Sequence, residues 1–329
     1  MVDSDVPRAR LGRTDMEITR VGFGAWAIGG GGWTNGWGPQ DDDQSVAAIR
    51  HAVESGINWI DTAGVYGHGH SEEVTARALR DIPEADRPYV FTKGGLGWNE
   101  RDHMEPAVRR GDPVSIRQDV EDSLRRLGVE RIDLFQMHWP AEDGSEIEDY
   151  WNVFAQLQQA GKLRAIGLSN HAIPALERAE AIAHVDSLQP PFSAIRPEAA
   201  TDGLLDWCAD HGTGVVVYSP MGSGLLTGAM TADRVAGLPE DDWRRRSPAF
   251  TTDLDQNLAT AAAIARVAER HEVSAAAAAI GWTLGFRGVT AAIVGARSPE
   301  QIDGWIAGAS VAFTPDDYAE VGPIAPHAA

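Results

Sequence analysis

Short apolar runs alternate with longer amphipathic segments along most of the chain. In the segments between the runs, apolar residues recur with helical spacing. The runs are apolar throughout, which predicts parallel strands covered by helices. Eight such strand–helix units in a single domain over residues 1–329 fit a closed (β/α)₈ TIM barrel better than an open sheet. The runs are Val21–Ala25, Ile57–Ile60, Tyr89–Thr92, Leu134–Met137, Ala165–Leu168, Ser187–Gln189, Val215–Tyr218 and Ala291–Val294.

Local signals mark where several helices begin and end. Asp42 or Asp43 is expected to cap a helix that stops at Gly56. Asp112, with a proline directly after it, predicts the start of a helix that ends at Gly128.

Three further segments complete the expected barrel. Arg8–Gly12 and Met16–Arg20 flank the turn Arg13–Asp15 and predict a β-hairpin that closes the barrel floor. Gly94–Gly111 and Thr227–Leu254 are too long for simple connections. We expect both as long loops on the catalytic rim, where such loops line or cover a ligand.

Composition narrows the kinds of partner. The net charge of −20 and the pI near 4.8 disfavour nucleic acid and anionic membranes. Cys208 is the only cysteine, so the chain holds no internal disulfide. The N-terminus is polar and no apolar stretch reaches bilayer length. We expect a cytoplasmic protein with a small-molecule partner; its oligomeric state is left open.

Four chemically active residues stand at the C-terminal ends of predicted strands: Asp61, Tyr66, Lys93 and His138. In a barrel these ends meet at one rim, where active sites are built. A lysine ammonium beside a tyrosine is expected to lower the phenol pKa from about 10 and make it a better acid. Asp61 would hold Lys93, and His138 would orient a substrate oxygen or relay the proton. Such a set suits proton donation to a carbonyl that receives hydride from a cofactor, and it needs no metal.

The same residues lie in motifs that resemble the aldo-keto reductase superfamily, in particular its bacterial branch. The resemblance covers essentially the whole chain and implies an NADPH-dependent reductase of aldehydes or ketones. The motifs are Asp61-Thr62-Ala63, Tyr66-Gly67, Ser71-Glu72, Phe91-Thr92-Lys93, Asp133-Leu134-Phe135-Gln136-Met137-His138-Trp139-Pro140, Gly161-Lys162, Ile166-Gly167-Leu168-Ser169-Asn170, Tyr218-Ser219-Pro220 and Gly224-Leu225-Leu226-Thr227-Gly228.

The resemblance also implies where the coenzyme would bind. Ser169, Asn170 and Gln189 would bond the nicotinamide carboxamide, and Tyr218 would stack on the nicotinamide ring. The residues implied along the pyrophosphate are Ser219, Met221, Ser223 and Leu225.

We assign Gly295, Arg297 and Gln301 to the adenosine end. Arg297 precedes a helix start at Ser298, with a predicted capping box to Gln301, and its guanidinium suits the 2′-phosphate of NADP. Use of NAD stays possible. The family's adenine-contacting residues are replaced here, so adenine could stack on Trp305 instead or bind loosely.

Tryptophans are concentrated on the predicted rim. They could form an aromatic wall for a hydrophobic or sugar-like carbonyl compound. His68 and His70 have a spacing suggestive of a metal site, but we find no third ligand and expect loop residues near the entrance. The substrate-wall candidates are Trp26, Trp33, Trp98 and Trp139.

Two other functions compete with a reductase. A nucleotide-binding regulatory subunit, like the potassium-channel partners of the same fold, would hold the cofactor and turn over slowly. A barrel hydrolase or isomerase using Asp61 would leave Lys93 and Tyr218 without a purpose.

Overall fold

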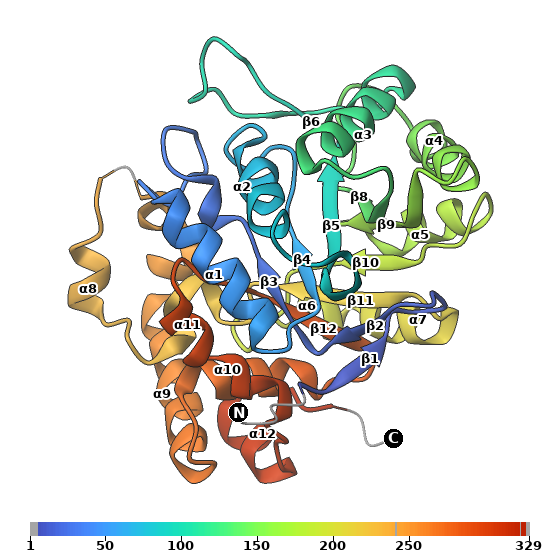
Figure 1. Ribbon diagram of the computed structural model, residues 1–329. Helices are drawn as coiled ribbons and strands as arrows, with labels where there is room; N and C mark the ends of the chain where they lie inside the picture. The colour runs from blue at the N-terminus through green and yellow to red at the C-terminus, as the bar shows by residue number, and fades with distance from the viewer. Residues whose placement is uncertain (1–5, 241, 323, 327–329) are drawn as a thin grey trace.

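The computed structural model describes residues 6–240, 242–322 and 324–326; the polar N-terminal residues before Val6 lie outside them. Among them, eight parallel strands close into a barrel, which confirms the predicted fold. The helices surround the strands (Figure 1). The barrel strands are β3 (Val21–Gly24), β4 (Trp59–Asp61), β5 (Tyr89–Gly94), β8 (Ile132–Met137), β9 (Leu163–Ser169), β10 (Ser187–Gln189), β11 (Gly214–Tyr218) and β12 (Val289–Gly295).

The helices that connect successive barrel strands bury one face each against the strands. They are α1 (Asp42–Glu54), α2 (His70–Leu79), α3 (Pro113–Leu127), α4 (Ile147–Gln159), α5 (Ile173–Glu180), α6 (Glu198–Thr201), α7 (Leu204–His211), α9 (Leu254–Arg270) and α10 (Ala275–Leu284). After β12 the chain forms α11 (Pro299–Asp303) and α12 (Pro315–Val321).

Both ends of α3 follow the prediction, whereas the starts of α1 and α11 differ from it. Asp112 accepts hydrogen bonds from the Val114 and Ser115 amides, and Gly128 ends α3 in the left-handed region with φ 67°. The cap of α1 is Asp41, one residue before the predicted pair, because its carboxylate reaches the amide of Gln44. The predicted capping box at Ser298 is wrong. Its side chain makes no cap bond, and Gln301 Oε1 instead accepts from the Arg297 amide at 2.7 Å.

The N-terminal hairpin, β1 (Arg8–Arg10) with β2 (Glu17–Thr19), lies across the N-terminal ends of the barrel strands. Leu11, Met16 and Ile18 are fully buried in one cluster with Trp59 and Phe91 from the barrel interior. These side chains fill the barrel from below, as predicted.

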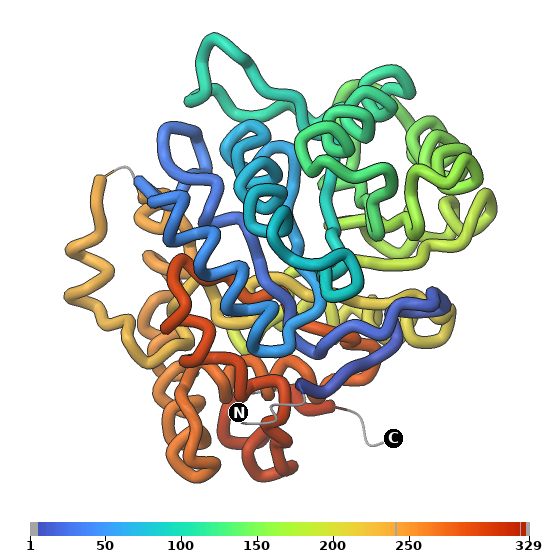
Figure 2. Tube along the Cα trace, in the orientation of Figure 1, coloured from blue at the N-terminus to red at the C-terminus, as the bar shows by residue number. Residues whose placement is uncertain are grey.

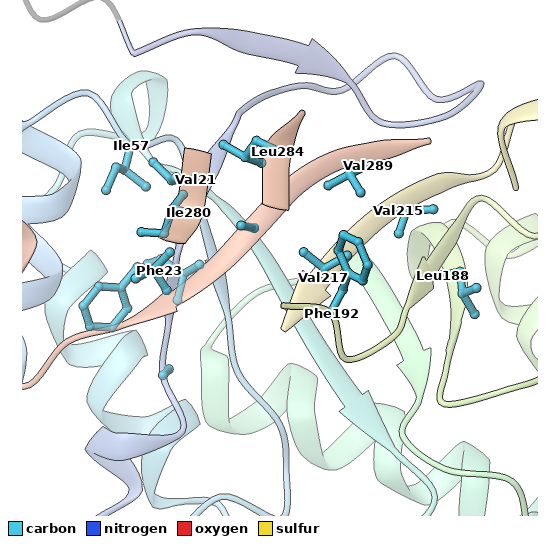
Figure 3. Packing of buried hydrophobic residues seen from close by; sticks show 14 of the residues in the cluster. Val21, Phe23, Ile57, Leu188, Phe192, Val215, Val217, Ile280, Leu284 and Val289 are labelled. Atoms are coloured by element: carbon cyan, nitrogen blue, oxygen red, sulfur yellow. The ribbon is translucent and has the colours of Figure 1, made fainter. Parts of the chain in front are cut away.

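A second apolar layer lies between the strands and the outer helices. Figure 3 shows Val21 and Phe23 of β3 beside Ile280 of α10 in this layer. The cluster continues around most of the barrel and leaves polar groups to the open rim.

Both long segments are loops on the rim with short elements of their own. The first carries the hairpin β6 (Leu96–Gly97) and β7 (Val108–Arg109), and its tip projects from the molecule in Figure 2. The second holds α8 (Ala232–Ala236) and a small apolar cluster of its own that includes Phe250. Among the described residues, no helix is long and apolar enough to span a bilayer.

Candidate active site

The four predicted rim residues meet at one point. Lys93 Nζ lies 2.5 Å from Asp61 Oδ1, 2.9 Å from the Thr62 carbonyl oxygen and 3.4 Å from the Tyr66 hydroxyl. The His138 ring packs edge-on against the Tyr66 ring, with centroids 5.7 Å apart. Asp61 and Lys93 are almost completely buried, at 3% and 1% exposed.

Local structure holds each member in place. Asp61 ends β4 and Lys93 lies near the end of β5, and these strands are neighbours in the barrel. Tyr66 stands in a tight turn between β4 and α2, where its carbonyl accepts from the Ser71 amide at 3.1 Å. His138 follows β8, and its amide donates to the Gly94 carbonyl at 3.0 Å.

The phenol pKa moves opposite to the sequence-based expectation. Burial, with a further contribution from the Asp61 charge, raises the pKa of Tyr66 well above its usual value. The Asp61 carboxylate offsets the Lys93 ammonium, so the pair does not act on the phenol as an isolated positive charge. Tyr66 therefore carries its proton throughout the neutral range.

The imidazole of His138 is neutral. Burial and the nearby Lys93 charge hold the pKa of His138 well below its usual value. Its Nδ1 is buried and has no hydrogen-bond partner among the described residues. Its Nε2 is not among the buried atoms that lack a partner. We therefore assign the ring proton to Nε2, where it can be donated to a ligand at the rim.

The residues expected around a nicotinamide lie on the adjoining strand ends. The Tyr218 hydroxyl donates to Asn170 Oδ1 at 2.8 Å, and Asn170 Nδ2 donates to the His138 carbonyl at 3.0 Å. Ser169 Oγ donates to the Gln189 carbonyl at 2.8 Å. Burial raises the pKa of Tyr218 to about 12, so this phenol remains a donor.

The segment after β11 has an unusual backbone. Ser219 and Ser223 have φ of 57° and 54°, in the left-handed region that L-residues seldom adopt. Met221 is half-buried, and the Leu225 side chain is fully buried under the second rim loop. Only the backbone of Leu225 is therefore available to a ligand.

The adenosine end differs from the expectation. The guanidinium of Arg297 is held by the loop after β3, through Gln40 Oε1 at 2.5 Å and the carbonyls of Trp37 and Pro39. Trp305 is 2% exposed and belongs to the core, so it cannot stack on adenine. Gly295 and Gln301 are exposed nearby on the same side of the barrel.

Two of the four candidate tryptophans lie beside Tyr66, and the other two have different partners. The rings of Trp26 and Trp33 lie 6.2 and 6.4 Å from that of Tyr66. Trp98 stacks on His68 instead, at 5.3 Å. Trp139 lies under the guanidinium of Arg109, at 4.5 Å, and no ring contact joins it to Tyr66.

Sequence reasoning overlooked one aromatic residue. Trp243, from the second rim loop, stacks on Trp26 at 5.9 Å and meets Trp37 edge-on at 5.7 Å. The three indoles join the loops that follow β3 and β11. The length of the second loop was the available signal, since it predicted a ligand-covering role without naming a residue.

The two histidines near Tyr66 do not act together. His70 pairs with Asp42 at 2.9 Å, whereas His68 packs against His103 with ring centroids 4.4 Å apart. Within the described part of the chain, no group of three or more His, Cys, Asp or Glu residues is placed to hold a metal ion.

A closed parallel barrel with Asp61, Tyr66, Lys93 and His138 together on its rim is typical of one class of protein, and comparison with known proteins identifies the family. Residues 20–325 match the Aldo/keto reductase family, and the chain belongs to that family.

Two curated bacterial proteins are similar along most of their length. Aldo-keto reductase YhdN of Bacillus subtilis is 34% identical over 292 residues, which cover 88% of this chain and 85% of that protein. The NADH-specific methylglyoxal reductase of Escherichia coli is 32% identical over 303 residues, covering 89% and 90%.

Among solved structures, the glycerol dehydrogenase AKR11B4 from Gluconobacter oxydans is 36% identical, with a TM-score of 0.86 and 99% of each chain covered. The aldo-keto reductase AKR11C1 from Bacillus halodurans shares the fold at 20% identity, with a TM-score of 0.72 and coverage of 96% and 95%.

Proposed function

We propose that this protein reduces an aldehyde or ketone to an alcohol, with NADPH as its coenzyme and Tyr66 as the proton donor. The observation that carries the proposal is the Tyr66 hydroxyl, 3.4 Å from an ammonium that is itself ion-paired to Asp61. The side chains on the adjoining strand ends fit a nicotinamide. It combines an aromatic ring at Tyr218 with amide oxygens at Asn170 and Gln189.

The protein's own groups handle the proton. The bound coenzyme would supply the hydride. Negative charge then develops on the carbonyl oxygen, and Tyr66 donates its proton to that oxygen. The raised pKa of Tyr66 means that its phenolate is unfavourable in the buried site. Lys93 stabilises this phenolate when the proton leaves. His138 donates a hydrogen bond from Nε2 to the same oxygen and orients the substrate.

The substrate class follows from the wall around Tyr66. Trp26 and Trp33 offer flat apolar faces, which suit either a hydrophobic carbonyl compound or the apolar face of a sugar-like one. Two relatives are named for glycerol and methylglyoxal, which are small, oxygen-rich molecules. We therefore infer that short, oxygenated carbonyl compounds are the first substrates to test.

Turnover tests the proposal against a regulatory subunit of the same fold. We expect the purified chain to consume NADPH through many cycles when a short aldehyde is present in excess, followed by absorbance at 340 nm. A single slow burst, equal in amount to the protein, would favour the regulatory subunit. Absence of any tryptophan fluorescence change on adding NADPH would instead revive a hydrolase or isomerase.

Arg297 supports NADPH over NADH. A 2′-phosphate would replace its neutral oxygen partners with a charged one, and hydrogen bonds to charged groups are stronger. We expect Arg297→Ala to weaken NADPH binding by about 10- to 100-fold and NADH binding by less than about 3-fold. Fluorescence titration with both coenzymes measures this.

The control for Arg297 is Gln40→Ala, which removes a partner from the loop and keeps the guanidinium. It should affect both coenzymes alike. If Arg297→Ala also weakened both equally, Arg297 would be a clamp for residues 37–40 rather than a reader of the 2′-phosphate. NADH would then be the better candidate, as in the relative from Escherichia coli.

A further inference from the structure

A buried glutamine lies directly beside the acid–base group without belonging to it. Gln136 is on β8, its side chain is fully buried, and its Cγ lies against Gly167 of the neighbouring strand. A buried amide is costly unless both of its ends are hydrogen-bonded. Its Nε2 lies 3.4 Å from Asp61 Oδ2, and its Oε1 accepts from Gln189 Nε2 at 3.2 Å.

The charge on Asp61 fixes the direction of these bonds. An ionised carboxylate only accepts hydrogen bonds. Its Oδ1 takes the Lys93 ammonium, so Oδ2 takes amide groups: Gln189 Nε2 at 2.9 Å and Gln136 Nε2 at 3.4 Å. Gln136 must therefore turn its NH₂ group toward Asp61 and its oxygen toward Gln189.

Gln189 then has a single orientation. Its Nε2 has two protons, and the structure uses one toward Asp61 and the other toward Gln136. One hydrogen bond alone would let the amide plane rotate about that bond, whereas two fix it. Its Oε1 has no partner among the described residues and is not closed off from the rim.

We propose that Gln136 is a positioning residue, which fixes the amide plane of Gln189 and aims Gln189 Oε1 at the nicotinamide carboxamide. The inference rests on the proposed function, which assigns Gln189 to that group. In this arrangement the Asp61 carboxylate binds Lys93 and also, through the two glutamines, determines that Gln189 presents its oxygen to the coenzyme. Recognition of the carboxamide NH₂ and placement of the proton donor thus share one carboxylate.

Equilibrium binding tests the inference without activity. The probes are NADP⁺ and its 3-acetylpyridine analogue, in which a methyl ketone replaces the carboxamide and removes the NH₂ donor. We expect the wild-type chain to bind the analogue about tenfold more weakly, the loss of one hydrogen bond. In Gln136→Met the ratio should fall below about threefold, because NADP⁺ binding weakens and analogue binding does not. Quenching of the eleven tryptophans reports both titrations.

Two variants serve as the negative and the positive control for Gln136→Met. Gln158→Met removes an amide at the opposite end of the barrel strands, where it donates to Asp186 Oδ2 at 2.9 Å, and should keep the tenfold ratio. Gln189→Met should lose the ratio, as Gln136→Met does. Gln136→Leu repeats the test with a different shape if the methionine variant does not fold.

A tenfold ratio retained in Gln136→Met or Gln136→Leu would overturn the inference. Equal weakening of both probes would overturn it as well, because general loosening of the site does not distinguish a carboxamide from a methyl ketone. Failure of the wild-type chain to bind either probe would overturn the proposed function, and this inference with it.

Discussion

Replacing Tyr66 with phenylalanine should lower kcat for aldehyde reduction by about 10²- to 10⁴-fold, the range for loss of a general acid. The phenylalanine ring keeps the packing against Trp26 and Trp33, so the wall of the site should survive. Only the hydroxyl near Lys93 is lost. Steady-state kinetics with a saturating short aldehyde measures the effect.

Coenzyme affinity provides the control for Tyr66→Phe. The residues proposed for the nicotinamide lie on β9, β10 and β11 or directly after β9, whereas Tyr66 comes from the turn after β4. We expect NADPH affinity within about threefold of wild type, since no hydrogen bond to the coenzyme is assigned to Tyr66. Turnover close to that of wild type would remove Tyr66 as the proton donor.

The barrel was predictable because its signals are local. Each strand is a short apolar run, and Asp112 and Gly128 fix the ends of α3 through bonds to their immediate neighbours. The hairpin followed from the turn Arg13–Asp15 between two short segments, and the structure buries Leu11 and Met16 beneath the barrel. Strand ends also predicted which residues share the rim, because parallel strands of a barrel all point the same way.

Contacts between segments that are far apart in the chain could not be predicted. The sequence predicts Arg297 as a phosphate ligand, but it does not show that Trp37, Pro39 and Gln40, more than 250 residues earlier, hold the guanidinium. Adenine was expected to be able to stack on Trp305, but the indole of Trp305 is buried in the core. No local pattern distinguishes these outcomes.

The pKa of Tyr66 was misjudged for a related reason. The sequence shows which charges come near the phenol, but not how far the group is removed from water. The structure buries it next to an ion pair whose two charges oppose each other, and burial then decides the direction. A tyrosine that keeps its proton at neutral pH can act as a proton donor, and the phenolate that forms when the proton leaves lies next to the Lys93 ammonium.

Replacing Lys93 with methionine should have the largest combined effect on activity and stability. The variant removes the group that stabilises the phenolate, so we expect kcat to fall by about 10²- to 10⁴-fold. It also leaves Asp61 buried, with side-chain exposure of 4%, and without its counter-charge. Breaking a buried ion pair in this way costs about 3–5 kcal/mol of unfolding free energy.

The sign of the pH dependence identifies the cause of that loss. Without Lys93, the buried carboxylate of Asp61 has no counter-charge, and a proton taken up at lower pH removes that unpaired charge from the folded state. The stability deficit of Lys93→Met should therefore shrink as the pH falls from 7 to about 5, as measured by urea unfolding against wild type.

A second substitution separates charge from packing. In the double variant Lys93→Met with Asp61→Asn, no unpaired charge remains, and Gln189 and Gln136 can still bond the new side chain. We expect most of the lost stability to return, because replacing both partners of a buried pair is often close to neutral. Activity should stay low, since no ammonium faces Tyr66. If the double variant were as unstable as Lys93→Met, the loss would come from the shape of the lysine side chain, and the buried pair would not be what holds this rim together.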